Sequence, residues 1–419
     1  MNKKKKQNQT AGPTVAPATD AQKCIDYLKQ RYDFRYNTVR KTTEFRRKGE
    51  KQFRDLEDED FRSIRTQIST DSNVNFKCSR ETLKDIIFSN TSWRKFDPFI
   101  DWAKRLPKWD GKDHIAELAA TVHTDDDKYF CWCLRKWIVA FLVCLIIEKE
   151  VNQTCLFLCG KQGTGKSTWV YNLLPPELQD YYACGSINFK DKDSQIQLCE
   201  LAIFNLDEGN SLKPKDIDNL KELVTLKKTK MRRAYAHKPS VFVRRASFVG
   251  TSNSTKILHD MTGNRRFLCQ NVLSIDYQHM VDLRQVYAQA LHIHRTGKFQ
   301  GKEFHYWFDN KEQSRVEKKN QKFRNESQEE ILIKECFEKG MKGENGTVLM
   351  DATTICREIM IKYPAYKLSP QKIGTTLSLM GFNEQYQHGG YHKWIVKRKT
   401  TQPKAETEER KITPRPSES

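Results

Sequence analysis

Eight consecutive residues, Gly160 to Ser167, carry the clearest chemical signal in this sequence. They read Gly-Lys-Gln-Gly-Thr-Gly-Lys-Ser, which fits the phosphate-binding pattern G-x4-G-K-[ST]. Glycines let backbone N–H groups surround phosphate oxygens, the lysine adds a positive charge, and the serine offers a hydroxyl ligand for Mg²⁺. The pattern therefore predicts a site for ATP and Mg²⁺. The residues expected to contact the nucleotide are Gly160, Gly163, Thr164, Gly165, Lys166, Ser167 and Thr168.

Two acidic residues and an asparagine follow at positions that suit the same chemistry. Asp207 and Glu208 end a mostly apolar run some forty residues after the glycine loop. We expect Asp207 to hold Mg²⁺ together with Ser167, and Glu208 to orient and deprotonate the attacking water. Asn253 ends another apolar run and is expected to hydrogen-bond the γ-phosphate or that water. A turn asparagine without a ligand is the alternative reading of Asn253.

Short apolar runs must position these side chains. Residues 155–159 are typical of a buried strand before the glycine loop, and residues 168–174 of a helix after it, stopped by Pro175. Residues 201–208 and 246–253 are typical of two further buried strands. Ligands of open α/β sheets lie at the carboxyl ends of the strands, where all these motif residues fall. The sequence therefore predicts an α/β P-loop NTPase core.

A basic segment, residues 227–245, separates the last two of these strands. Its flanks alternate or contain β-branched residues, and its centre resembles a turn, so we expect a β-hairpin with cationic arms. Arg232, Arg233, His237 and Lys238 are the residues expected to contact a phosphodiester backbone. A solvated basic hairpin without a ligand remains the alternative.

Two adjacent arginines, Arg265 and Arg266, follow a Gly-Asn turn. Arginine suits transition-state charge because its planar group is always protonated. We expect one of the pair to enter the ATP site of a neighbouring subunit as an arginine finger, and the other to form a structural ion pair.

The charge balance favours a nucleic-acid partner. The sequence holds 73 Lys and Arg against 53 Asp and Glu, a formal net charge of +20. A generally basic, soluble surface is the alternative. The 12 cysteines form no zinc-binding pattern, so reduced thiols in a cytoplasm are the simplest account. The most apolar run, residues 137–147, is shorter than the roughly 20 residues that span a membrane. We therefore expect a core helix there and no membrane partner.

Composition divides the chain into five parts. We expect a disordered basic tail over 1–20, an N-terminal α+β region over 21–110, a P-loop ATPase domain with leading helices over 111–300, a winged-helix-like domain over 305–399, and a disordered tail over 400–419. Within the N-terminal region, the patterns predict strands at 32–39 and 42–46 and helical structure over 78–103.

The C-terminal region has the pattern of three helices and a hairpin, which suggests a winged helix. The helices are expected at 327–338, 352–360 and 370–380, and the hairpin at 383–396. The first helix would bury Ile331, Leu332, Ile333, Cys336 and Phe337. The third would show Gln371, Lys372, Thr375 and Thr376 to a DNA groove, with Lys372 as the main contact. A winged helix that binds protein instead of DNA is the alternative.

The order of these motifs is similar to that in superfamily 3 helicases of the AAA+ class. The wording Thr251-Ser-Asn253 and Thr262-Gly-Asn-Arg-Arg-Phe267 resembles the virulence-associated protein E family of phages and mobile elements, and so does the proline-bounded stretch 96–111. The resemblance covers roughly residues 90–300. It implies phosphate and Mg²⁺ binding by the glycine loop, a nucleotide-sensing role for Asn253, and a finger at Arg265 or Arg266. Related hairpins often carry Lys-His at the tip, whereas this chain has His237-Lys238.

Three functions are compatible with these expectations. The first is an ATP-dependent helicase or translocase on single-stranded DNA, working as a homo-oligomeric ring (a hexamer by expectation) with a primase or initiator as a further partner. The second is a DNA-stimulated ATPase that loads or remodels complexes, or interferes with phage, without unwinding. The third is a small-molecule P-loop kinase, which gives no reason for the cationic hairpin or the paired arginines.

Overall fold

The computed structural model of the chain describes residues 18–89, 92–186, 191–207, 214–231, 239–260, 263–387 and 391–399. Its elements fall into two compact units of mixed α/β structure. The first unit comprises Met1–Gly209, Asp218–Asn253 and Gln270–Phe308, and the second comprises Asn210–Ile217, Ser254–Cys269 and Asp309–Ser419. The predicted mixture of helices and strands is confirmed.

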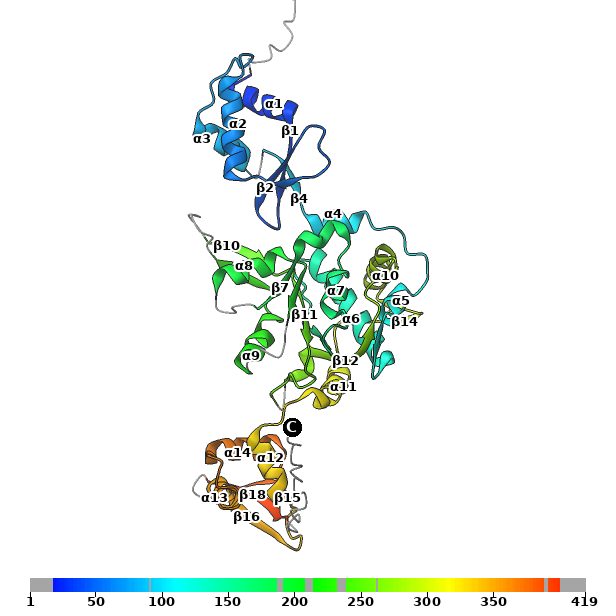
Figure 1. The fold of residues 1–419 in the computed structure, drawn as a ribbon, viewed down its shortest axis with the longest axis vertical. Helices are drawn as coiled ribbons and strands as arrows, with labels where there is room; N and C mark the ends of the chain where they lie inside the picture. The colour runs from blue at the N-terminus through cyan, green and yellow to red at the C-terminus, as the bar shows by residue number, and fades with distance from the viewer. Residues whose placement is uncertain are drawn as a thin grey trace, which may run out of the picture. The chain divides into compact units, whose positions relative to one another are not determined.

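The N-terminal part of the first unit is a small sheet packed against helices (Figure 1). Its elements are α1 (Asp20–Arg31), β1 (Tyr32–Asn37), β2 (Thr42–Arg47), β3 (Arg54–Asp55), α2 (Asp58–Thr70), α3 (Arg80–Phe88) and β4 (Arg94–Phe96). The strand order is β3-β2-β1-β4, with β1 antiparallel to β2 and parallel to β4. Both predicted strands are confirmed. The expected run of helix over 78–103 is wrong in its middle, because β4 pairs there with β1.

A larger set of elements follows in the chain. From Pro98 to Leu206 these are α4 (Pro98–Lys104), α5 (His114–Ala120), β5 (Val122–Thr124), α6 (Asp127–Ile146), β6 (Cys155–Cys159), α7 (Lys166–Tyr171), η1 (Pro176–Tyr181), β7 (Tyr182–Gly185), α8 (Lys192–Glu200) and β8 (Ile203–Leu206). The next are α9 (Pro214–Leu223), β9 (Lys228–Met231), β10 (Ser240–Val243), β11 (Ser247–Ser252), η3 (Asn264–Arg266), β12 (Phe267–Ile275), α10 (Leu283–Thr296), β13 (Lys298–Phe299) and β14 (Lys302–Glu303).

Six of these strands form the main sheet, in the order β5-β12-β6-β11-β8-β7 (Figure 1). β11 pairs in parallel with β6 and β8, and β7 pairs in parallel with β8, whereas β12 is antiparallel to β5. All of β6 is buried, which explains its unbroken apolar run. Because parallel strands end at one edge, the residues that follow β6, β8 and β11 meet there.

Helix α6 is a core element of this unit. Its residues from Trp137 to Leu145 are all buried. Among the described helices, α6 is the one long and apolar enough to cross a membrane by composition, but 78% of that stretch is buried inside the protein. The prediction of a core helix is therefore confirmed.

The second unit has its own apolar core, built from three helices and a four-stranded sheet. Its elements after residue 308 are α11 (Asn310–Asn320), η4 (Gln321–Phe323), α12 (Gln328–Cys336), β15 (Phe337–Lys339), β16 (Thr347–Asp351), α13 (Ala352–Lys362), α14 (Pro370–Leu379), β17 (Glu384–Gln387) and β18 (Tyr391–Arg398). β18 is the central strand and pairs antiparallel with β15, β16 and β17.

The predicted helices and the β17–β18 pairing are confirmed, with three corrections. Ile331 is 44% exposed, so it does not belong to the buried face of α12. Phe337 is buried, but it begins β15 and does not continue the helix. Thr376 is buried beside Leu377 and therefore does not face a groove, whereas Gln371, Lys372 and Thr375 are exposed. Helical periodicity alone could not show that β15 ends this helix.

Candidate nucleotide site

The glycine loop lies between the end of β6 and the start of α7, as predicted. Gly163 and Gly165 have φ angles of 79° and 83°, in the left-handed region that favours glycine. Gly165 is also the N-cap of α7, and a Cβ there would lie 2.2 Å from the Tyr277 ring. Both backbone conformation and space therefore require glycine at this position. The helix begins at Lys166 and directs its first N–H groups toward the loop.

Lys166 is held at the centre of the loop. Its Nζ donates hydrogen bonds to the carbonyl oxygens of Gly160 and Lys161 at 2.9 and 2.7 Å, and it lies 3.3 Å from Asn253 Oδ1. The side chain is buried, and this burial lowers the pKa of Lys166, while the charge of Asp207 opposes the shift. An anion beside this lysine would stabilise its charged form, because the attraction offsets the free-energy cost of burying the charge.

Asp207 follows β8 and faces the start of α7. Its Oδ1 accepts hydrogen bonds from Thr251 Oγ1 at 2.6 Å and from Ser167 Oγ at 3.2 Å. Thr251 was not predicted as a site residue, although it lies in β11 only two residues before Asn253. Glu208, the expected base, lies outside the described residues. The structure thus brings Lys166, Ser167, Asp207 and Asn253 together, as the spacing predicted.

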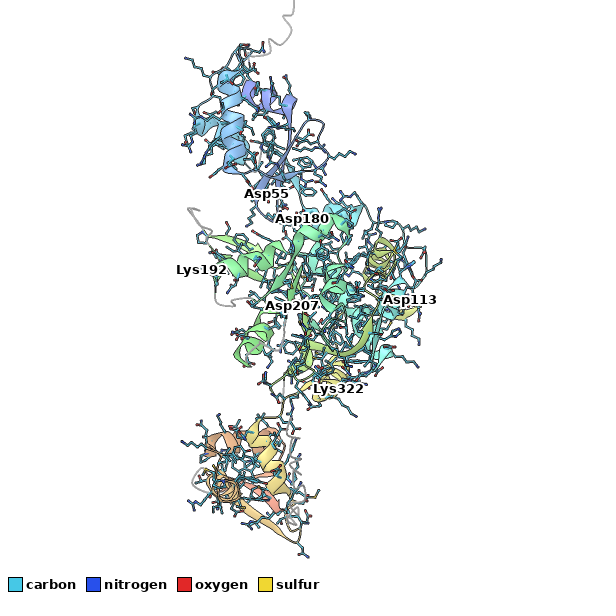
Figure 2. The ribbon with its side chains drawn as sticks, viewed as in Figure 1. Asp55, Asp113, Asp180, Lys192, Asp207 and Lys322 are labelled. Carbon is cyan, nitrogen blue, oxygen red and sulfur yellow. The ribbon has the colours of Figure 1, made fainter. Side chains whose placement is uncertain are left out.

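These residues surround a cavity of about 280 Å³ at the carboxyl edge of the sheet. Figure 2 labels Asp207 among the central green elements. The lining is Gln162, Gly163, Thr164, Gly165, Lys166, Ser167, Thr168, Asp207, Thr251, Ser252 and Asn253. Gly160 lies deeper, where its N–H donates to the Ser252 carbonyl at 3.0 Å. Backbone N–H groups, one buried lysine and a helix N-terminus give this cavity the chemistry of an anion site.

The donor set also suits Mg²⁺. This ion is usually held by one or two carboxylates together with phosphate oxygens and water, and not by a protein cage. Asp207 and Ser167 provide a carboxylate and a hydroxyl 3.2 Å apart. Among the described residues, no group of three His, Cys, Asp or Glu side chains is arranged to hold a metal by itself. All 12 cysteines are free thiols.

Arg265 and Arg266 lie in η3, within the second unit. Asn320 Nδ2 fixes this turn by donating to the carbonyl oxygens of Asn264 and Phe267 at 2.8 and 2.7 Å. Arg265 is exposed and Arg266 is half-buried, and burial followed by the charge of Arg265 lowers the pKa of Arg266. Neither arginine has an ion-pair partner in the part of the chain that the structure describes, so the expected structural ion pair is not found.

The predicted basic hairpin is present as β9 and β10, which pair antiparallel from Lys228–Val243 to Met231–Ser240. Arg232, Arg233, His237 and Lys238 lie outside the described residues. The expectation of two cationic arms is wrong at the C-terminal end of the segment 227–245. Arg244 and Arg245 are buried, and Arg244 donates to the backbone carbonyls of Asn152, Val224, Leu226 and Ala246. Both therefore hold the base of the hairpin and are not available to a polyanion.

Lys372, the residue expected to contact DNA from α14, is exposed. Its Nζ lies 3.7 Å from Glu329 Oε1 of α12, and the lysine side chain is 72% exposed. An ion pair this open to water contributes little stability and leaves the lysine able to exchange partners.

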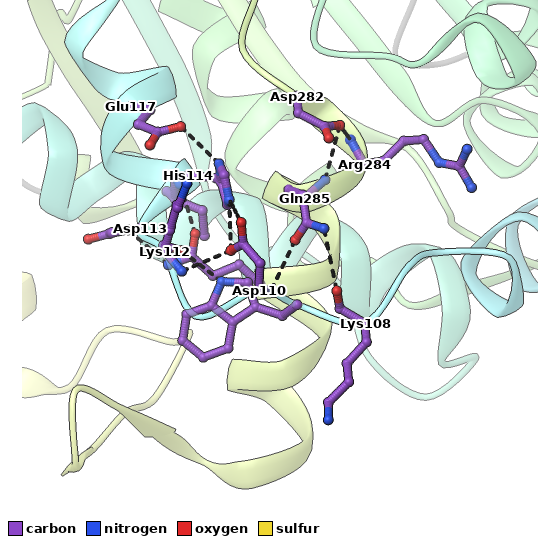
Figure 3. Close-up of polar contacts among 12 residues, drawn as sticks. Lys108, Asp110, Lys112, Asp113, His114, Glu117, Asp282, Arg284 and Gln285 are labelled. Carbon is purple, nitrogen blue, oxygen red and sulfur yellow. Dashed lines mark hydrogen bonds and ion pairs between the residues drawn. The ribbon is translucent and has the colours of Figure 1, made fainter.

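One polar cluster was not predicted at all. His114, the first residue of α5, lies between two carboxylates: Nε2 is 2.9 Å from Asp110 Oδ1, and Nδ1 is 2.8 Å from Glu117 Oε2 (Figure 3). Burial alone would lower the pKa of His114, but the two carboxylates outweigh it and raise this pKa. Asp110 N–H also donates to Gln285 Oε1 of α10, so the cluster ties the segment before α5 to α10.

Residues 103–325 match the family model of the virulence-associated protein E-like domain. No curated protein matches the chain. Among solved structures, the apo C-terminal region of NrS-1 is 13% identical with a TM-score of 0.47, covering 91% of this chain and 99% of that one. An A form of the same region is 13% identical with a TM-score of 0.48, covering 90% and 99%. At this identity and TM-score, the similarity carries no information about function.

The family match overlaps most of the stretch that the sequence motifs mark, roughly residues 90–300, and continues to residue 325. It includes the glycine loop, Asp207, Asn253 and the paired arginines. Because it spans more than half of the chain's 419 residues, the chain belongs to the virulence-associated protein E-like domain family.

Proposed function

We propose that this protein is an ATP-hydrolysing motor that moves on single-stranded DNA during the replication of a phage or mobile element. The finer fold that this implies is a P-loop NTPase core of the AAA+, superfamily 3 helicase type, followed by a winged-helix-like domain. The carrying observation is that Lys166, Ser167, Asp207 and Asn253 come from three separate strand ends to one 280 Å³ cavity. This is the arrangement that binding and cleavage of a triphosphate need.

Each residue in this cavity has a distinct proposed role. The N–H groups of residues 163–168 bind phosphate oxygens at the start of α7, and Lys166 adds charge where the transferred phosphoryl group becomes more negative. Ser167 and Asp207 would hold Mg²⁺, which when bound neutralises phosphate charge. Asn253, 3.3 Å from Lys166 Nζ, is placed to sense the terminal phosphate. Glu208 orients and deprotonates the attacking water.

The assembly is proposed to be a homo-oligomeric ring, with six subunits as the expected number. Arg265 and Arg266 support this proposal, because they have no ion-pair partner among the described residues and sit on a turn fixed by Asn320. An arginine without an internal partner is suited to complete the site of another copy. A primase or an initiator protein is proposed as a further partner of the ring, and a cytoplasm as its location.

DNA is proposed to contact two places. The β9–β10 hairpin carries the exposed lysines Lys227, Lys228 and Lys230 on its described part, and Arg232, Arg233, His237 and Lys238 beyond it. The winged-helix-like domain, proposed over 305–399, presents Gln371, Lys372 and Thr375 from one helix. The remaining proposed parts are the N-terminal region over 21–110, the ATPase domain over 111–300, and tails over 1–20 and 400–419.

The test is ATP hydrolysis measured with and without single-stranded DNA, beside strand displacement on a forked duplex. Wild-type protein is compared with Lys166→Ala and with Lys128→Ala, which removes an exposed lysine on α6. We expect hydrolysis that DNA stimulates, strand displacement that requires ATP, and loss of both in Lys166→Ala alone.

The outcomes separate the competing functions. Stimulation without displacement would favour an ATPase that loads or remodels complexes. Hydrolysis that DNA does not change, coupled to phosphorylation of a small acceptor, would favour a kinase. Absence of ATP binding would overturn all three.

A further inference from the structure

A second cavity lies in the first unit, at the end of α10 and along the segment that follows β14. Its volume is about 600 Å³, and no residue in its lining belongs to the nucleotide cavity. Val139 of α6 and Ile293 of α10 form the apolar floor, and His305, Tyr306 and Trp307 supply aromatic rings. This cavity has no part in the function proposed above.

The aromatic rings of this cavity form an open stacking surface. Trp307 is 52% exposed, and its ring stacks on His305 with a centroid distance of 4.4 Å and an interplanar angle of 27°. Tyr306 meets Trp307 edge-on at 5.2 Å. The exposed part of such a ring can accept another flat ring by offset stacking.

This surface is also rigid. Buried Lys136 of α6 donates through Nζ to the carbonyl oxygens of His305 and Trp307 at 2.8 and 2.9 Å. The Tyr306 hydroxyl donates to Glu150 Oε2 at 3.1 Å. These bonds hold both the backbone that carries the rings and the Tyr306 side chain. The protein would therefore lose little conformational entropy when a ligand binds.

Positive charge borders the rings. Arg295 of α10, Lys298 of β13 and Lys302 of β14 are exposed, and none of them has an ion-pair partner in the described ranges. The one carboxylate in the lining, Glu303, lies 3.2 Å from His305 Nε2. Glu150, which accepts the hydrogen bond from Tyr306, is a second carboxylate beside the rings, so the three cations outnumber the carboxylates by one, which suits phosphate groups.

We propose that this cavity binds single-stranded DNA, with a base stacked on Trp307 and neighbouring phosphates held by Lys298 and Lys302. Aromatic faces beside cations bind single strands with little sequence preference, because every base has a flat face. The inference rests on the proposed DNA motor for its choice of polymer, and it adds a contact site separate from the hairpin and from α14.

The test is photo-crosslinking of the full-length protein to an oligothymidylate that carries 5-iodouracil, with the linked residues identified by mass spectrometry. Affinity is measured in parallel for wild type, Trp307→Ala, Trp307→Phe and Phe88→Ala, which removes another exposed aromatic ring. We expect crosslinks within residues 304–307. Trp307→Ala should bind about 5- to 150-fold more weakly, as loss of one stacked base predicts, whereas Trp307→Phe and Phe88→Ala should bind nearly as wild type.

A second variant, with a charge reversal at an exposed position, keeps the test informative if Trp307→Ala does not fold. Lys302→Glu should weaken binding and make it less dependent on salt, since each lost phosphate contact lowers the slope of log affinity against log salt by about 0.7 for a single strand. Crosslinks found only elsewhere, together with unchanged affinity in Trp307→Ala and Lys302→Glu, would overturn this inference and point to a protein ligand. The motor proposal itself would still stand if DNA then stimulated ATP hydrolysis.

Discussion

Lys166 illustrates how one side chain can depend on strand ends that are far apart in the chain. Its Nζ reaches the carbonyl of Gly160 at the end of β6 and the amide oxygen of Asn253 after β11. The β6 and β11 strands are neighbours in the sheet, so this contact follows from topology. The lysine proposed to bind phosphate thus also connects the glycine loop to the residue that follows β11.

Replacing Lys166 with Ala should lower ATP turnover by about 100-fold or more, because a charge aimed at the phosphates is lost. The fold should survive, since Lys166 lines the cavity and is not part of the apolar core. Turnover and the melting temperature are the two measurements, with Lys128→Ala as the matched control. Turnover that persists in the Lys166 variant would contradict the proposed site.

His114 makes a pH-dependent contribution to stability. Its pKa is raised in the folded protein, so this contribution is fully present below the ordinary histidine pKa of about 6.5 and is lost as pH rises through the folded value. His114→Gln should cost about 1.5–3 kcal/mol at pH 6 and clearly less at pH 9. Melting temperatures at both pH values test this. His123→Gln, at a side chain that is 64% exposed, is the control. An equal loss of stability at both pH values would contradict the proposal that the protonated form of His114 supplies this stability.

These residues also show what sequence can and cannot predict. Gly163, Lys166 and Asp207 belong to local patterns, whose chemistry is readable without the fold. The contact between Asp110 and Gln285 was not predictable, because 175 positions separate these two residues, although the two partners of His114 itself lie only three and four positions away. Arg244 looked like part of a solvated basic run, yet it is buried among backbone carbonyls. Charge type alone does not reveal exposure.

At the scale of elements, the turn between β1 and β2 contacts the proposed DNA hairpin. Lys41 Nζ donates to the Val241 carbonyl at 3.0 Å and lies 3.9 Å from the centre of the Phe242 ring. Val241 belongs to β10, the strand that pairs with β9. The N-terminal region, to which the sequence assigned no chemistry, is thus placed to steady the hairpin.

Lys41→Met should therefore loosen the β9–β10 pairing. Loss of one hydrogen bond and one cation–π contact is worth about 1 kcal/mol, so amide hydrogen exchange over 228–243 should become about fivefold faster. Mass spectrometry of exchanged peptides measures this change. Lys51→Ala, an exposed lysine in the same region, should leave the exchange rate unchanged. Equal protection in Lys41→Met and wild type would show that this contact does not support the hairpin.

At the scale of the whole molecule, some of the side chains that make up the +20 net charge serve the fold and are not exposed to a ligand. Arg244 and Arg245 are buried and stabilise the base of the hairpin. Only part of the cationic excess is available to a polyanion. The net charge therefore overstates the surface that a nucleic acid could contact.

A shared ATP site can be tested by mixing two inactive variants. Lys166→Ala lacks the lysine of the loop, and Arg266→Ala lacks one of the two arginines proposed as the finger. In a ring of both, about a quarter of the interfaces would combine an intact loop with an intact arginine, as a head-to-tail interface requires. Turnover should reappear on mixing and follow that fraction. Each variant mixed with itself is the control, and a mixture that stays inactive would contradict completion by a neighbour.

The anchoring of Arg244 has a mechanical consequence. Its guanidinium joins the end of β10 to the backbone before β6, to the backbone after α9, and to the start of β11. The end of β10 is therefore tied by hydrogen bonds to the backbone that leads into β6, the strand before the glycine loop. A load applied to the β9–β10 pair would reach the backbone just before β6 directly, through this one guanidinium.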